Sequence, residues 1–282
     1  MAYTTLITVE QLVPLLGDPQ TVVVDCRFSL ADPAAGEQQY AEGHVPGAVY
    51  AHLDRDLSSA ATETSGRHPL PVPAELAATL ANWGIDASKQ VVAYDESGSA
   101  FAARFWWVAK WLGLKNVAVL DGGLAAWKAA GQPVSTEVSK LTPTTFTPEP
   151  NRSMWLSTDD VQAGLASGEM LLVDARGATR YSGEEEPIDP VAGHVPGAVN
   201  RSQVENLNEA GEFRSPAELA ERFDELIGNR ETGSVVHMCG SGVTACVNLL
   251  ACELAGHHGT KLYPGSWSEW IRDSKRGVAT NC

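Results

Sequence analysis

Short apolar runs alternate with longer amphipathic stretches along this chain, in an order that occurs twice. Runs of four to six β-branched and aliphatic residues are typical of strands buried on both faces of a parallel sheet. Such strands are expected at 21–25, 90–95, 116–120, 171–174 and 234–239. Because helices are expected between them, the pattern predicts an α/β fold in which helices flank mainly parallel sheets.

Helix starts are marked by capping residues and by proline. Thr8 and Gln11 have capping-box spacing, and the segment Leu156-Ser157-Thr158 is expected to cap another helix. Further helices are expected from Pro73, from Pro216, over 100–112, around Trp127 and from Val243 onward. In the last of these, one apolar face is predicted, formed by Ala245, Leu249, Leu250 and Leu254.

The order of elements indicates two tandem copies of one domain. The sequence GHVPGAV at 43–49 recurs without change at 193–199, 150 positions later. Residues 135–153 are rich in threonine and proline and show no periodicity. The sequence therefore predicts an N-terminal domain at 1–134, an extended linker at 135–153 and a C-terminal domain at 154–282.

Cys239 follows the last long predicted strand and opens a turn that leads into a helix, Gly240-Ser241-Gly242-Val243-Thr244. Backbone N–H groups of residues 240–244 can turn toward the sulfur, and the helix N-terminus adds partial positive charge. Both effects favour the thiolate, which is the nucleophilic form. We therefore expect Cys239 to be a nucleophile in a solvent-reachable loop, although most cysteines beside a loop are simply buried.

The two copies differ at this position, because Asp95 stands in the first copy where Cys239 stands in the second. A carboxylate cannot act as a sulfur nucleophile, so the first copy is expected to be catalytically inactive. Functional loops lie at the carboxyl ends of parallel strands. Arg176 follows another such strand, and we expect it to brace the loop by pairing with Asp174.

Charge and cysteine content narrow the class of protein. The net charge is −15, with 9 basic and 16 acidic residues in 1–150 and 11 and 19 in 151–282. Neither half is basic, so neither nucleic acid nor an anionic membrane is expected as a partner. The five cysteines lack C-x-x-C spacing, and no metal site or cofactor is expected. Free thiols, with no signal peptide or membrane span in the pattern, indicate a cytoplasmic protein.

Several motifs together resemble the rhodanese family of sulfurtransferases in its two-domain form. They are GHVPGAV in both copies, DAR at 174–176 with Arg180 following, CGSGVTA at 239–245 and GSWSEW at 265–270. The resemblance covers the chain from Val22 through Trp270 and implies tandem rhodanese-like domains. The CGSGVTA loop is similar to that of 3-mercaptopyruvate sulfurtransferases, whereas thiosulfate sulfurtransferases of this form carry basic residues just after the cysteine.

The resemblance implies that Cys239 accepts a sulfur atom as a persulfide and passes it to a thiol, such as that of thioredoxin, or to cyanide. It implies that Arg180 binds the carboxylate of the donor. The loop residues Gly240, Gly242, Val243 and Thr244 are expected to cradle the substrate sulfur through their N–H groups.

Two further side chains are candidates. Ser241 is expected to donate a hydrogen bond or relay a proton to the leaving enolate, and its alternative is a plain turn residue. His44, in the first copy, is a candidate for a His–Ser relay implied by the resemblance. Its alternative is a structural role, because His194 occupies the same repeat position. For Arg180 the alternative is a surface ion pair within 184–186.

One departure from the family pattern and three alternative activities bear on this assignment. Many 3-mercaptopyruvate enzymes carry a second arginine nine residues after the equivalent of Arg180, but Asp189 stands there. Thiosulfate is therefore kept as an alternative donor. A persulfide carrier that serves a protein acceptor is kept as a further alternative. A phosphatase or arsenate reductase loop needs an arginine six residues after the cysteine, where this chain has Ala245. The expected activity is sulfur transfer from 3-mercaptopyruvate.

Overall fold

A computed structural model describes residues 2–281 and divides the chain into two compact units. The first unit comprises the described residues up to Ser59, then Leu70–Asn151 and Glu209–Glu212. The second comprises Ala60–Pro69, Arg152–Asn208 and the described residues from Phe213 onward. Each unit therefore receives one short segment from the other half of the chain, and the sequence pattern did not predict this exchange.

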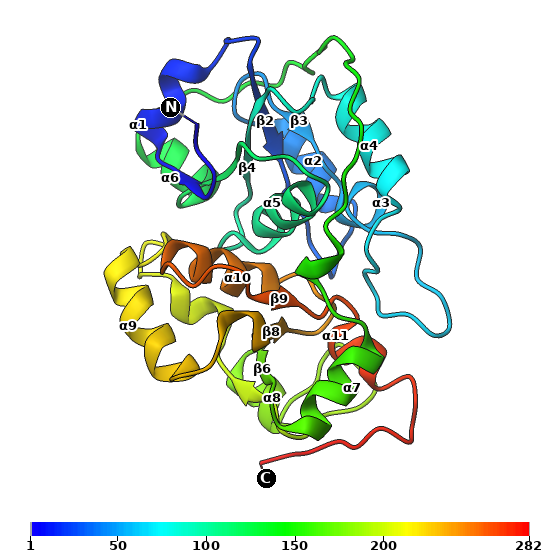
Figure 1. Cartoon of the computed structure of the whole chain (residues 1–282). Coiled ribbons are helices and arrows are strands. Elements are labelled where there is room, and N and C mark those ends of the chain that lie inside the picture. Colours follow the sequence, from blue (N-terminus) through cyan, green and yellow to red (C-terminus); the bar gives the residue numbers. More distant parts are fainter. Residues whose placement is uncertain (1, 282) are drawn as a thin grey trace. The chain divides into compact units, whose positions relative to one another are not determined.

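The first unit alternates strands and helices in the expected order (Figure 1). Its strands are β1 (Leu6–Ile7), β2 (Thr21–Asp25), β3 (Val49–Tyr50), β4 (Gln90–Tyr94) and β5 (Val117–Leu120). Its helices are α1 (Val9–Leu12), η1 (Val13–Leu15), α2 (Ala35–Glu42), α3 (Leu53–Asp56), α4 (Pro73–Asn82), α5 (Ala100–Trp111) and α6 (Gly123–Ala129). The predicted capping box is confirmed, because Thr8 and Gln11 exchange side-chain and backbone hydrogen bonds.

The second unit repeats this order with shorter strands. These are β6 (Leu171–Asp174), β7 (Val199–Asn200), β8 (Val235–Met238) and β9 (Lys261–Leu262). Its helices are η2 (Arg152–Met154), α7 (Thr158–Ser167), α8 (Ala178–Ser182), η3 (Gln203–Asn206), α9 (Pro216–Ile227), η4 (Thr232–Ser234), α10 (Ala245–Leu254) and α11 (Ser266–Trp270). Ser157 caps α7 as predicted.

Both sheets are parallel, which confirms the predicted fold class. The strand order is β1-β5-β4-β2-β3 in the first unit and β7-β6-β8-β9 in the second. In the first sheet Asp25 pairs with Tyr94, and in the second Asp174 pairs with Met238. The residues that follow these strands, Asp95 and Cys239 among them, therefore lie at the carboxyl edge of each sheet, where ligands bind in such folds.

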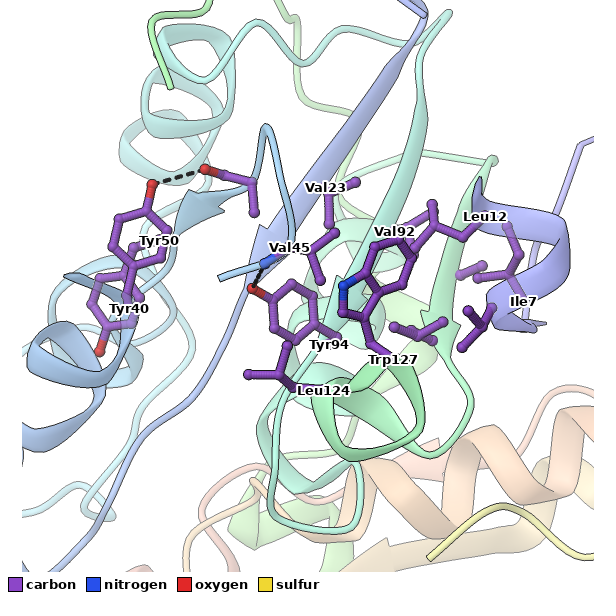
Figure 2. Close-up of a cluster of buried hydrophobic side chains, with 14 residues drawn as sticks. Ile7, Leu12, Val23, Tyr40, Val45, Tyr50, Val92, Tyr94, Leu124 and Trp127 are labelled. Atoms are coloured by element: carbon purple, nitrogen blue, oxygen red, sulfur yellow. Dashed lines mark hydrogen bonds between the residues drawn. The ribbon is translucent and has the colours of Figure 1, made fainter. Parts of the chain in front are cut away.

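The core of the first unit lies between the sheet and the helices beside it (Figure 2). Trp127 is fully buried against the strand residues Val92 and Tyr94. The Tyr94 hydroxyl accepts the Val45 N–H at 3.0 Å, so the GHVPGAV turn is fixed to the central strand. The second unit has a smaller core of the same kind around Trp267, Tyr263 and Val236.

Helix α10 differs from its prediction in one respect. Burial is continuous from Ala245 to Cys252 instead of following one face, and Leu254 is only half-buried. The reason is that α10 packs against β8 and β9 on one side and against α9 and η3 on others. A helix enclosed in this way needs apolar residues all round, and the sequence supplies them.

The segment predicted as a linker has no helix or strand between residues 136 and 151. It lies on the first unit through backbone hydrogen bonds from Thr144 to Ala81, from Glu149 to Leu112 and from Asn151 to Trp111. Its side chains are exposed or half-buried. The segment therefore belongs to the first unit, held by main-chain contacts to α4 and α5.

Candidate active site

The loop after β8 is shaped by two glycines and by a hydrogen-bonded neighbour, α11. Gly242 has φ +77°, and a Cβ at this position would lie 2.5 Å from the Pro264 carbonyl oxygen. The carbonyls of Cys239 and Gly240 accept N–H bonds from Trp267 and Ser268 at 3.0 and 2.9 Å. The loop is therefore anchored through its carbonyl groups.

Four N–H groups of this loop have no acceptor among the residues that the structure describes; they belong to Gly240, Ser241, Val243 and Thr244. Unpaired N–H groups in successive residues form an anion-binding cradle. These N–H groups belong to residues that follow Cys239 in the chain and lead into the first turn of α10. The helix dipole places partial positive charge there. The arrangement suits a thiolate or a persulfide anion.

The equivalent loop of the first unit shows what such a cradle binds. The buried carboxylate of Asp95 accepts four backbone N–H groups at 2.8–3.0 Å, those of Ser97, Ser99, Phe101 and Ala102. Burial raises the pKa of Asp95, and these four hydrogen bonds act in the opposite direction. In the first copy the position of Cys239 is therefore occupied by a carboxylate, which fills its own cradle of N–H groups.

Cys239 is more enclosed than the sequence indicated. Only 2% of its surface is exposed, so the expectation of a solvent-reachable side chain is wrong. Its N–H donates to the hydroxyl of Ser266 at 3.1 Å, and that hydroxyl donates to the Tyr263 carbonyl. A segment from far away in the sequence also lies against this loop.

That segment is Ala60–Pro69, which belongs to the second unit although it precedes α4. The N–H of Gly66 donates to Glu269, and the N–H of Arg67 donates to the Ser268 hydroxyl at 3.1 Å. His68 Nδ1 lies 2.7 Å from the Ser241 hydroxyl, and both side chains are buried. Ser241 is therefore not a plain turn residue, because it is paired with an imidazole.

Two arginines reach the loop beside Cys239. A Cβ added to Gly240 would lie 2.9 Å from Arg67 Nη2, 3.5 Å from Arg180 Nη2 and 3.7 Å from Arg180 Nη1. Arg67 Nη2 and Arg180 Nη1 have no hydrogen-bond partner within the described part of the chain. Two guanidinium groups therefore lie beside the loop that carries Cys239, although Gly240 and Ser241 are themselves neutral.

Two acids hold these arginines in place. Glu186 accepts from Arg180 Nε and Nη2 at 3.1 and 2.8 Å, and Asp189 accepts from Arg180 Nη2 at 3.2 Å and from Arg67 Nη1. Burial raises the pKa of Glu186, but the Arg180 hydrogen bond and the N–H groups of Asp189 and Ile188 outweigh it, and the net pKa is lowered. Arg180 thus forms the ion pair that was the alternative to binding a donor carboxylate. Its side chain is nevertheless only 20% exposed and still faces the loop.

Arg176 braces the carboxyl end of β6, as predicted. Its guanidinium contacts Asp174 through Nε at 3.0 Å and Nη2 at 2.7 Å, and both side chains are buried. Arg27 and Asp25 repeat this geometry in the first unit. Arg176 also lies over the Trp267 ring, 4.9 Å from its centroid. A residue engaged in this way in both copies has a structural task.

His44 does not have the geometry of a site residue. It is fully buried and stacked on Tyr40, and its two ring nitrogens lie 2.7 Å and 3.1 Å from the carbonyls of Tyr40 and Glu137. His194 repeats this arrangement on Tyr181. Because both imidazoles close the same turn inside their own units, the structural alternative for His44 is the one that fits. The histidine that pairs with Ser241 is His68.

The other cysteines described by the structure are buried free thiols. Burial raises the pKa of Cys26 and Cys252, which disfavours their thiolate forms. Cys246 is fully buried on α10, and Cys282 lies outside the described residues. Among the described helices, none is long and apolar enough to cross a membrane.

Sequence reasoning missed Arg67 and His68. They stand in a loop without periodicity, between the strand at 49–50 and the helix at Pro73, and no motif marks them. The one available signal was a pair of adjacent basic residues directly after Gly66 in an otherwise small and polar stretch.

Comparison with known proteins agrees with this architecture. A family model for the rhodanese-like domain matches residues 8–130 and 157–273. A Pseudomonas aeruginosa protein named "Probable 3-mercaptopyruvate sulfurtransferase" is 49% identical over 282 residues, which cover 99% of each chain. A thiosulfate sulfurtransferase from Rattus norvegicus is 34% identical over 262 residues, 90% of this chain and 86% of the rat protein.

Among solved structures, the 3-mercaptopyruvate sulfurtransferase SseA from Escherichia coli superimposes with a TM-score of 0.82. The two chains are 30% identical, and the match covers 94% of this chain and 100% of the other. With the family model on both halves and this similarity over nearly the full length, the chain belongs to the rhodanese family and contains two tandem rhodanese-like domains.

Proposed function

We propose that this protein is a sulfurtransferase that moves a sulfur atom from 3-mercaptopyruvate to a thiol or cyanide acceptor through a persulfide on Cys239. The choice of donor rests on the Gly240-Ser241 turn. This turn is uncharged, and its Ser241 hydroxyl is paired with His68 at 2.7 Å. A hydroxyl held in this way suits the keto or enolate oxygen of an α-keto acid. The named relatives of both donor types are consistent with the reaction class.

The first step forms the persulfide. The Cys239 thiolate attacks the sulfur of 3-mercaptopyruvate, a sulfur–sulfur bond forms, and the carbon–sulfur bond of the donor breaks. The electron pair of that bond leaves as pyruvate enolate, which takes up one proton to become pyruvate. The paired Ser241 hydroxyl and His68 imidazole would hydrogen-bond the enolate oxygen and pass on that proton.

The second step regenerates the enzyme. An acceptor thiolate or cyanide attacks the outer sulfur, the sulfur–sulfur bond breaks, and its electrons return to the Cys239 sulfur. Between the steps, the N–H groups of Gly240, Val243 and Thr244 stabilise the persulfide. Arg180 and Arg67 hold the donor carboxylate through the two guanidinium nitrogens that lack a protein partner. The buried free thiols fit a reducing, cytoplasmic setting.

Thiosulfate is the second candidate donor, and the two arginines beside Gly240 favour it. Two guanidinium groups can bind a dianion even though residues 240 and 241 carry no charge. The reaction would be the same at Cys239, with sulfite leaving in place of the enolate.

Steady-state kinetics with both donors and one common acceptor test the proposal. We expect a higher kcat/KM for 3-mercaptopyruvate than for thiosulfate. After donor addition, intact-mass analysis should show one extra sulfur, about 32 Da, in the wild type. The control Cys26→Ser, which changes a buried cysteine of the first unit, should keep this adduct, and Cys239→Ser should lose it. An equal adduct in Cys239→Ser would refute the nucleophile, and a preference for thiosulfate would refute the donor.

A further inference from the structure

Asp189 is the acid that joins the two arginines of the site. One of its carboxylate oxygens accepts from Arg67 Nη1 and the other from Arg180 Nη2, and its side chain is only 3% exposed. The residues come from distant parts of the chain, 122 positions apart for Arg67 and Asp189. A single carboxylate therefore sets the spacing of the two guanidinium groups that face Gly240.

The charges of this cluster are balanced before any donor binds. Arg67 and Arg180 supply two positive charges, while Asp189 and Glu186 supply two negative charges when both are ionised. Arg176 contacts Glu186 as well, but its charge is offset by the buried Asp174. A donor that brings one negative charge leaves the cluster at −1, and a dianion leaves it at −2. Each added negative charge is costly where the groups are mostly desolvated.

We propose that Asp189 is a specificity-determining residue that selects a monoanionic donor over a dianionic one, because its charge repels the second negative charge of a donor held by Arg67 and Arg180. The proposal deepens the proposed function and rests on it. It also gives a role to the position at which this chain departs from the second arginine expected from the family resemblance.

The surroundings of Asp189 support this assignment. Burial raises the pKa of Asp189; Arg67, Arg180 and Arg176 act against the rise, and the charge of Glu186 adds to it. Acidification should therefore neutralise Asp189 at a higher pH than an ordinary aspartate. Because the lowered pKa of Glu186 keeps that residue ionised longer, the first charge lost from the cluster on acidification is that of Asp189.

The experiment compares Asp189→Asn, Asp189→Glu and the control Glu185→Gln. Glu185 is an exposed acid of the same segment, so its substitution removes one charge outside the cluster. The ratio of kcat/KM for thiosulfate to kcat/KM for 3-mercaptopyruvate should rise about tenfold in Asp189→Asn, because one negative charge near the donor is removed. It should stay near the wild-type value in Glu185→Gln and in Asp189→Glu, which restores the charge.

A pH series of the same kcat/KM ratio adds a measurement that would not change if Asp189 had only a structural role. In the wild type the ratio should rise toward thiosulfate as the pH is lowered, and the rise should begin above the pH at which an ordinary aspartate takes up its proton. This rise should be lost in Asp189→Asn. Effects on Cys239 cancel in the ratio, because both donors use the same nucleophile. Any effect of His68 on the enolate is common to the wild type and Asp189→Asn, which are therefore compared at each pH. A ratio that is the same in the wild type and in Asp189→Asn, or that moves equally in Glu185→Gln, would overturn the proposal.

Binding separates this inference from the proposed reaction. Calorimetric titration of pyruvate, a monoanion, and of sulfate, a dianion, needs no turnover. Asp189→Asn should strengthen sulfate binding about tenfold relative to pyruvate binding. If the wild type transfers sulfur from neither donor but this shift is seen, the proposed function fails and the selectivity of Asp189 stands. If sulfur is transferred but the binding ratio does not change, the selectivity fails alone.

Discussion

Replacing Gly242 with alanine places a methyl group against the backbone of Pro264. The added Cβ would lie 2.5 Å from the Pro264 carbonyl oxygen and 2.9 Å from its Cα. Contacts between such atoms are favourable only at about 3.5 Å, so the loop and Pro264 must separate by about 1 Å. The backbone φ of +77° adds a second penalty, because residues with a side chain adopt it at a cost.

The two penalties can be separated with a matched control. Gly168, at the end of α7 in the same unit, has φ +74° and open space within 4 Å of its added Cβ. Gly168→Ala therefore carries the conformational cost of about 1–2 kcal/mol alone, reduced by about 0.4–1 kcal/mol because alanine restricts the unfolded chain. Gly242→Ala adds an overpacking cost of about 1–3 kcal/mol, and we expect a total of about 3 kcal/mol.

Urea denaturation of the two variants measures the difference in unfolding free energy, and initial rates measure the effect on the loop. A displacement of about 1 Å at the N–H groups beside Cys239 should lower kcat/KM about 100-fold, while Gly168→Ala should keep wild-type kinetics. If Gly242→Ala is no less stable than Gly168→Ala and is equally active, the contact with Pro264 does not shape the loop and the reasoning is wrong.

Two further predictions concern the charged residues around this loop. Asp174→Asn should lower the unfolding free energy by about 3–5 kcal/mol, since it leaves the buried Arg176 without its main partner; a urea midpoint equal to that of wild type would contradict the bracing role. Glu186 has a lowered pKa in the folded protein. Its ionised form therefore stabilises the fold at pH values above its ordinary pKa of about 4.3. This contribution is lost as the pH falls through the lower pKa of the folded state. The stability difference between wild type and Glu186→Gln should therefore shrink between about pH 7 and about pH 3, and a difference that grows on acidification would reverse the assignment.

The amino-acid sequence by itself determined the local structure and the position at which the two copies differ in their candidate nucleophile. Strands such as Thr21–Asp25 and Leu171–Asp174 form where β-branched runs predict them. The caps at Thr8 and Ser157 form because their partners are only three residues away. The repeat placed Asp95 opposite Cys239, and the pairing of Tyr94 and Met238 with the neighbouring strands agrees with that alignment. All of these features depend on periodicity or on contacts within a few residues.

Only the tertiary structure decided what surrounds Cys239. His68 pairs with Ser241 across 173 positions of sequence, and Arg67 meets Asp189 across 122. The segment that carries Arg67 and His68 has no periodicity, so its place is set by its hydrogen bonds to α11. The same segment lies against the loop that the sequence had indicated to be solvent-reachable, in which Cys239 is buried. Residues brought together by loops leave no local pattern, because the free energy that places them comes from contacts formed only in the folded chain.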